Sequence, residues 1–215
     1  MSTRSPMLWS DALRESARWR LLGLLFERPR TGWQEELESL AAEVDSKDLR
    51  VAASAASGSG EGFVLAFIGP GGPVSPREIA YRQARDPGHI LAQLAAAYRA
   101  FAFTPQREDP LDHVAVEVGF VAYLRMKQAF AAVHGDQDSA ALAAEAAERF
   151  MAEHLAAFAP QLAARLEECA AGHLHLAARA LADRVPHFED PAPASNVACV
   201  ESAGCAFTCG GDSHE

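Results

Sequence analysis

The chain has 215 residues, 49% of them hydrophobic, and its 19 basic and 29 acidic side chains give a net charge of −10. This length suits one domain with a buried core, or one domain plus a tail. Alanine supplies much of the hydrophobic share and favours helix, whereas the long Val, Ile and Thr alternations typical of strands are absent. An acidic surface without a Lys/Arg cluster repels a phosphate backbone, so the composition argues against nucleic acid as a partner.

The charge and cysteine patterns also predict the compartment. The most apolar N-terminal run, Leu21 to Phe26, has six residues and charged neighbours. An export signal needs an apolar run of about 7–15 residues and a membrane span needs about 20. Three of the four cysteines lie in the last 17 residues, unlike a disulfide framework. We therefore expect no stable membrane insertion, and a cytoplasmic location with reduced thiols.

The predicted elements are all helices. The first begins at Ser10, which suits an N-cap, and ends at Arg28-Pro29 because proline disfavours helix in the residue before it. Residues 52–62 are small and rich in Gly and Ser, which predicts a flexible loop. In chain order, the expected helices cover residues 10–27, 33–44, 63–68, 86–101, 109–133, 139–158, a segment from Pro160, and a segment after Gly172 that ends near Val185.

These elements predict an all-α fold. We expect a single bundle-like domain of about eight helices over residues 1–185. From Pro186 the composition changes to Pro, Gly and Cys, so residues 186–215 are expected to form a flexible tail that contains cysteines.

The segment that opens the 109–133 helix carries the most polar pattern. Asp109 suits an N-cap, Pro110 the first helical position, and Asp112 the positive end of the helix dipole. His113 and Glu117 are four residues apart, on one helix face, where they can pair. From the residues alone, either helix-start chemistry or a binding site accounts for this pattern.

The rest of that helix is apolar nearly all round, which places it at the centre of the core. Gly119, in the middle of the helix, is expected to mark close packing with a neighbouring helix. The helix start would then present Asp109, Asp112 and His113 at the rim of an apolar mass. Such a rim suits a peptide that has both cationic and apolar parts.

Several stretches resemble the TorD/DmsD/NarJ group of redox-enzyme maturation chaperones. FVLAFIGPGGP at 63–73 is similar to the group's Leu-Phe-x-Gly-Pro turn, and residues 75–82 are similar to the Pro-x-x-Ser-x-Tyr stretch that follows. Residues 97–103 resemble its Tyr-x-x-x-Gly-Phe segment, with Ala102 where Gly is usual. EDPLDHVAVEVGFVAYL at 108–124 resembles its Pro-x-Asp-His motif and the hydrophobic helix after it. The likeness follows the family's order over residues 10–185.

This resemblance implies a chaperone and not an enzyme. Its partners would be the precursor catalytic subunit of a molybdopterin oxidoreductase and that subunit's twin-arginine signal peptide, held until the cofactor is inserted. The oligomeric state, monomer or homodimer, stays open. The leader-binding residues that the resemblance implies, together with the adjoining carboxylates, are Glu108, Pro110, Asp112, His113 and Glu117. Carboxylates pair well with guanidinium groups.

Two other functions compete with this prediction. Cys199, Cys205 and Cys209 in the tail suit a zinc ion or an iron–sulfur cluster, so the chain could be a metal or cluster carrier, although a chaperone requires no cofactor. Their spacing lacks the C-x2-C pairs of a typical zinc site, and inert or redox-active thiols remain an alternative. A hydrolase that uses Asp112 and His113 is the other rival, but the sequence offers no nucleophile motif.

Overall fold

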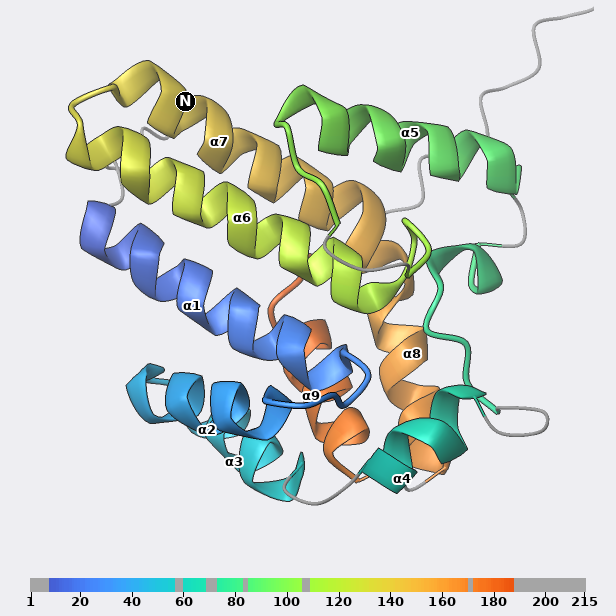
Figure 1. Ribbon diagram of the computed structural model, residues 1–215. Coiled ribbons are helices and arrows are strands. Elements are labelled where there is room, and N and C mark those ends of the chain that lie inside the picture. Colours follow the sequence, from blue (N-terminus) through green and yellow to red (C-terminus); the bar gives the residue numbers. More distant parts are fainter. Residues whose placement is uncertain are drawn as a thin grey trace, which may run out of the picture.

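The computed structural model describes residues 8–56, 60–68, 73–82, 85–105, 109–169 and 172–187 (Figure 1). Within these ranges the chain forms helices and no β-strand, apart from an isolated bridge between Arg77 and His113. The all-α prediction is confirmed. None of the described helices is both long and apolar enough to cross a membrane.

Eight α-helices of ten or more residues make up most of the described chain. They are α1 (Trp9–Phe26), α2 (Trp33–Glu43), α3 (Lys47–Ala56), α5 (Pro87–Ala100), α6 (Val114–Val133), α7 (Gln137–Phe150), α8 (Ala156–Glu168) and α9 (His173–Ala182). The shorter elements are α4 (Gly60–Phe63), the π-helical segments η1 (Val64–Ile68) and η3 (Met151–Leu155), and the 3-10 turn η2 (Glu78–Ala80). The apolar run at 63–68 is therefore helical, as predicted.

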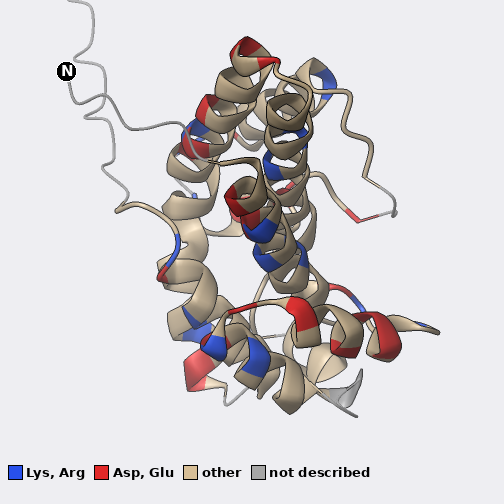
Figure 2. Ribbon diagram, turned by 90° about the vertical axis from the view of Figure 1, so that its left-hand side faces the viewer, with Lys and Arg blue, Asp and Glu red and all other residues tan. Residues whose placement is uncertain are grey.

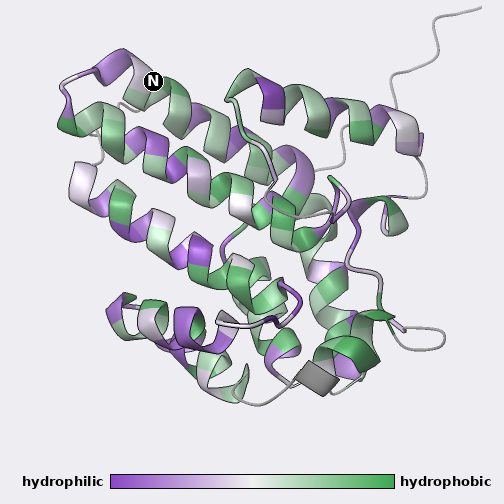
Figure 3. Cartoon of the chain, viewed as in Figure 1, coloured by the Kyte–Doolittle hydropathy of each residue, from purple (hydrophilic) through white to green (hydrophobic). Residues whose placement is uncertain are grey.

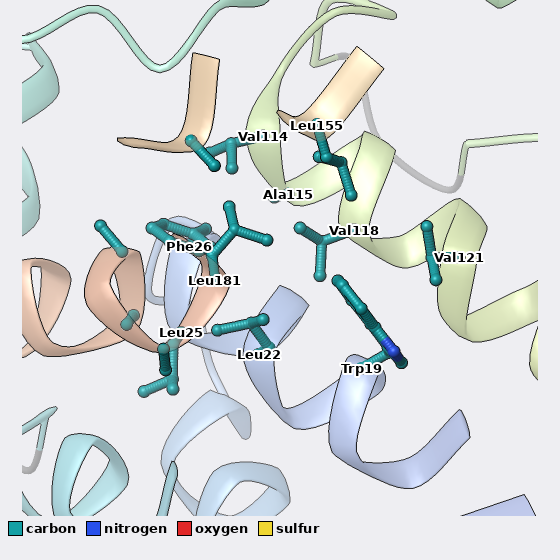
Figure 4. Packing of buried hydrophobic residues seen from close by; sticks show 14 of the residues in the cluster. Trp19, Leu22, Leu25, Phe26, Val114, Ala115, Val118, Val121, Leu155 and Leu181 are labelled. Carbon is teal, nitrogen blue, oxygen red and sulfur yellow. The ribbon is translucent and has the colours of Figure 1, made fainter. Parts of the chain in front are cut away.

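Helices α1 and α6 form an antiparallel pair at the centre of the molecule (Figure 1). The Ser16 hydroxyl donates a 2.8 Å hydrogen bond to the Ala122 carbonyl across this contact. At Gly23 a Cβ atom would lie 3.6 Å from Val118 Cγ1 and 3.7 Å from the Gly119 backbone nitrogen, so the two helices are in van der Waals contact here. Figure 4 shows α1 and α6 side chains packed together with Leu155 and Leu181.

The remaining helices cover this pair. Helix α7 packs on α6, and α9 contacts α1, α3 and α8. Hydrophobic positions follow the helix faces that meet, while hydrophilic positions gather on the outer faces (Figure 3). Acidic and basic positions are interspersed over the helices (Figure 2). The central position predicted for the 109–133 helix is confirmed for its first two-thirds, but Met126, Phe130 and Val133 are exposed.

Besides the start of α6, which is described with the cleft, three predicted boundaries were wrong. Residues 52–56, expected in a loop, belong to α3, whose Leu49, Ala52, Ala53 and Ala56 are buried at helical spacing. Alanine's high helix propensity supports this helix. The first helix begins at Trp9, and no side chain caps it.

The third wrong boundary lies between α7 and α8. The chain stays helical through the wide π turn η3, and Pro160 lies inside α8 instead of starting a new helix. A π turn alters the local hydrogen-bond ladder, which suits a nearby residue that lacks an N–H.

Candidate binding cleft between α1 and α6

A cleft of about 630 Å³ opens between α1, the start of α2, α6 and the segment that follows α5. We call it the α1–α6 cleft. A volume of this size holds a small ligand or a few residues of a peptide. It is lined by Ser16, Arg20, Glu27, Arg30, Glu36, Ala102, Phe103, Thr104, Pro105, Asp109, Ala115, Val116, Gly119, Ala122, Tyr123 and Met126.

Small residues line the α6 side of the cleft. Ala115, Gly119 and Ala122 recur at i, i+4 and i+7, and so lie on one helix face. A Cβ atom added at Gly119 would meet nothing within 4 Å. The prediction that Gly119 marks close helix packing was wrong, because a side chain at this position would enter open space in the cleft.

Aromatic side chains form a second wall. The ring centroids of Phe103 and Tyr123 lie 5.3 Å apart, and the Tyr123 hydroxyl donates a 3.1 Å hydrogen bond to the Phe101 carbonyl. Between these rings and α5, Ala102 adopts φ 55°, a left-handed conformation that favours glycine. The backbone at this position therefore favours the glycine that the predicted resemblance leads us to expect there.

The part of the cleft formed by α1, α2 and their connection is charged, and its basic and acidic side chains pair with one another. Arg20 donates to Glu27 and to Glu36, each at 2.6 Å, and Arg30 donates to Glu36 at 2.5 Å. These partners lower the pKa of Glu36 and raise that of Arg20, while burial opposes both shifts. Asp109 forms no ion pair with any residue that the structure describes. Its carboxylate is therefore available to pair with a cationic ligand.

Behind Asp109, an ion pair between the buried Asp112 and the partly exposed Arg77 fixes the start of α6. Arg77 Nε donates to both Asp112 carboxylate oxygens, at 3.0 and 3.1 Å, and its Nη2 lies 2.9 Å from Oδ1. The backbone reinforces this contact: Glu78 N–H donates to the Asp112 carbonyl at 2.9 Å, and Val114 N–H to the Pro76 carbonyl at 2.8 Å. The segment 75–82 is thereby clamped to the helix start.

The clamp also explains where α6 begins. His113, not the predicted Asp109, is the N-cap: its Nδ1 accepts a hydrogen bond from Ala115 N–H at 3.2 Å. Residues 109–113 form a separate turn, with His113 N–H donating to the Pro110 carbonyl. Burial lowers the pKa of His113, which keeps Nδ1 free to accept. Asp112 and His113 contact different partners, so they do not form the Asp–His pair that a hydrolase would use.

Glu117 lies in the buried region beside this clamp. It is fully buried, and neither carboxylate oxygen has a hydrogen-bond partner in the described structure. The pairing predicted between His113 and Glu117 was therefore wrong. Burial, and then the negative charges of Glu78 and Asp112, raise the pKa of Glu117 well above its ordinary value, which favours its protonated form.

A neighbouring polar pair completes the buried network. Glu78 is fully buried and contacts the Arg82 guanidinium, and its Oε2 lies 3.0 Å from His154 Nδ1. Arg82 also donates to the Glu153 carbonyl at 3.0 Å, which links the 75–82 segment to η3.

The structure divides the predicted leader-binding residues into two groups. Pro110 is exposed next to Asp109, at the edge of the cleft. Asp112, His113 and Glu117 are buried in the interior of the chain. Glu108 lies outside the described residues. Direct contact of Asp112 with a guanidinium would require Arg77 to leave it. A role of these five residues in leader binding stays a prediction.

Sequence reasoning missed the contribution of α1 and α2. Arg20, Glu27, Arg30 and Glu36 come from two helices and their connection, and only the fold brings them opposite Asp109. A usable signal was the spacing of Arg20 and Glu27, which are seven residues apart and thus on one helix face.

The predicted metal ligands Cys199, Cys205 and Cys209 lie outside the described residues. Among the residues that are described, no group of three or more His, Cys, Asp or Glu side chains could hold a metal ion, and Cys169 is exposed and free. The carrier hypothesis stays a prediction, as does the boundary between the domain and the tail at residue 186.

The fold and the site thus define an all-helical bundle with a peptide-sized cleft beside a clamped helix start. The family model described as nitrate reductase delta subunit matches residues 27–164, and the chain belongs to this family. The predicted resemblance is confirmed, since this is the NarJ/TorD-type family of molybdoenzyme maturation chaperones. Comparisons with curated proteins and with solved structures gave no significant match.

Proposed function

We propose that this chain binds the twin-arginine leader and the apo-form of a molybdopterin oxidoreductase catalytic subunit, assists cofactor insertion and delays export. Such a protein acts in the cytoplasm, where the precursor is made. Membership of a molybdoenzyme maturation family supports the client class. The α1–α6 cleft supports peptide binding, because it combines aromatic walls with a charged end.

The observation that carries the proposal is Asp109. It lines the cleft, it is partly exposed, and it has no cationic partner among the described residues, whereas Glu27 and Glu36 are already paired. An arginine of the leader can pair with this carboxylate through two parallel N–H donors. We assign Asp112, His113 and Glu117 to the support of this turn, and Pro110 to its rigid exposed edge.

The first experiment identifies the client. The tagged full-length chain is purified from its native host, and co-purifying proteins are identified by mass spectrometry. The proposal predicts a molybdopterin oxidoreductase catalytic subunit that still carries its leader.

The second experiment tests the site by calorimetric titration with a synthetic peptide of that leader. Asp109→Asn is expected to weaken binding about three- to tenfold, the value of one partly exposed charge-assisted hydrogen bond. Asp138→Asn is the matched control, because it removes the same charge from an exposed position on α7. Equal affinity of Asp109→Asn and wild type would exclude Asp109 from the site, and no binding to the wild-type chain would refute leader binding.

A further inference from the structure

Next to the α1–α6 cleft, four large apolar side chains are exposed. They are Trp9 (50% exposed) and Leu13 (48%) on α1, and Met126 (48%) and Phe130 (67%) on α6. We call them the apolar strip. The other two tryptophans, Trp19 and Trp33, are only 3% exposed, so exposure of Trp9 is not a general property of tryptophan in this chain.

Helical spacing makes the strip continuous with the cleft. On α1, positions 9, 13, 16 and 20 lie on one face, and Ser16 and Arg20 of this face line the cleft. On α6, positions 119, 123, 126 and 130 lie on one face, and the first three line the cleft. Because α1 and α6 run antiparallel, with Ser16 bonded to Ala122, the strip's residues on both helices lie at the same end of the pair (Figure 1).

The combined surface changes character along its length. Asp109 and the Arg20–Glu36 and Arg30–Glu36 pairs lie at one end, the small residues Ala115 and Gly119 in the middle, and the apolar strip at the other. Phe130 follows Gly119 by eleven positions along α6, a distance of about 16 Å at 1.5 Å per residue. The surface from Asp109 to Phe130 is thus polar at one end and apolar at the other, and its length suits a single bound peptide.

We propose that the cleft and the apolar strip form one groove that holds an amphipathic peptide in a single orientation, with its cationic end at Asp109 and its apolar stretch over Trp9 and Phe130. This inference rests on the proposed function and adds the direction and length of the bound peptide. An apolar stretch of about 11 residues covers the length from Gly119 to Phe130 if it is helical, and about 5 if it is extended.

Size and charge favour a peptide over a second copy of this chain. Four half-exposed side chains offer at most a few hundred Å² of apolar surface, whereas a stable interface needs about 800 Å² from each partner. A second copy would also bring a net charge of −10 to a chain of the same charge, and the two chains would repel each other. A cationic, partly apolar peptide complements both ends.

Trp9 provides a direct test through tryptophan fluorescence. Because Trp19 and Trp33 are buried, a change of emission when a peptide binds reports on Trp9 and thus on the apolar strip. The probe is a synthetic peptide with two adjacent arginines followed by ten Leu and Ala residues. We expect it to shift the emission of the wild-type chain to the blue, and Trp9→Phe, which removes the reporting indole, to abolish the shift. A peptide with Ser and Gly in place of Leu and Ala should leave the emission unchanged.

Affinity measurements give the second readout. Phe130→Ser should weaken binding about tenfold or more, the effect of one buried aromatic side chain. Leu142→Ser, at an equally exposed apolar position on α7 outside the groove, should bind as wild type does. Circular dichroism checks that both variants are folded.

The outcomes separate the inference from the proposed function. If peptide binding depends on Asp109, but Trp9 emission does not shift and Phe130→Ser binds with wild-type affinity, the proposed orientation of the peptide is wrong. Leader binding itself would then stand. If Phe130→Ser instead converts a dimer to a monomer in sedimentation and leaves peptide affinity intact, the strip serves a second copy and the inference is overturned. If no twin-arginine peptide binds, the proposed function fails as well.

Discussion

The Asp112→Asn substitution separates a supporting role of the clamp from a direct one. Asp112 is fully buried, and its carboxylate accepts from Arg77 at 3.0 and 3.1 Å. Loss of one partner of a buried pair costs roughly 3–5 kcal/mol. The Arg77 side chain is 37% exposed and can turn towards water, so we expect a smaller loss of about 2–3 kcal/mol.

For a chain of this length, 1 kcal/mol shifts the melting temperature by about 2–4 °C, so Asp112→Asn should lower it by roughly 4–12 °C. Calorimetric melting and urea unfolding measure the effect, with Asp138→Asn as the control. Leader affinity should fall only as far as the 109–113 turn loosens. If Asp112→Asn melts as wild type does but loses leader binding, Asp112 contacts the leader directly and the supporting role is refuted.

Two further predictions concern the surroundings of the cleft. Because the pKa of Glu117 is raised above its ordinary 4.5, the folded chain holds a proton that the unfolded chain releases, and stability should fall as pH rises from 4.5 towards the raised pKa. Glu117→Gln should remove this fall, up to about 1.4 kcal/mol per pH unit, in urea unfolding between pH 4 and 8; parallel curves for variant and wild type would contradict it. Ala102→Gly should stabilise the chain by about 1 kcal/mol by relieving the φ of 55°, whereas Ala96→Gly, at an exposed position inside α5, should destabilise it by a similar amount. Thermal unfolding followed by circular dichroism compares the two, and a lower melting temperature for Ala102→Gly would refute the strain.

Local patterns in the sequence predict most of the fold. The apolar spacing in α1, α5 and α6 and the Arg28-Pro29 stop locate these helices to within a few residues, since helix amphipathicity is a local property. The start of α6 was placed at Asp109 because Asp and Pro are a standard helix opening. A contact with Arg77, 35 residues earlier in the chain, shifts that start to Val114.

The site was harder to predict from the sequence for the same reason, because it depends on contacts between residues that are far apart in the chain. The sequence directs attention to the 108–117 segment, whose described polar residues divide between the cleft edge and the interior. A sequence shows that Asp109 and Asp112 are three residues apart, but not that one lacks a cation and the other has Arg77. The cleft's other wall depends on how α1 packs against α6, which is a tertiary property.

Gly119→Leu tests most directly the central claim that the leader occupies the α1–α6 cleft. The new side chain has room in the unliganded chain, because a Cβ at this position meets nothing within 4 Å, and leucine improves helix propensity by about 1 kcal/mol. The account predicts an unchanged or higher melting temperature and a loss of leader affinity of about tenfold or more, while Ala141→Leu, exposed on α7, binds as wild type does. A folded Gly119→Leu chain with wild-type leader affinity would show that the leader binds elsewhere.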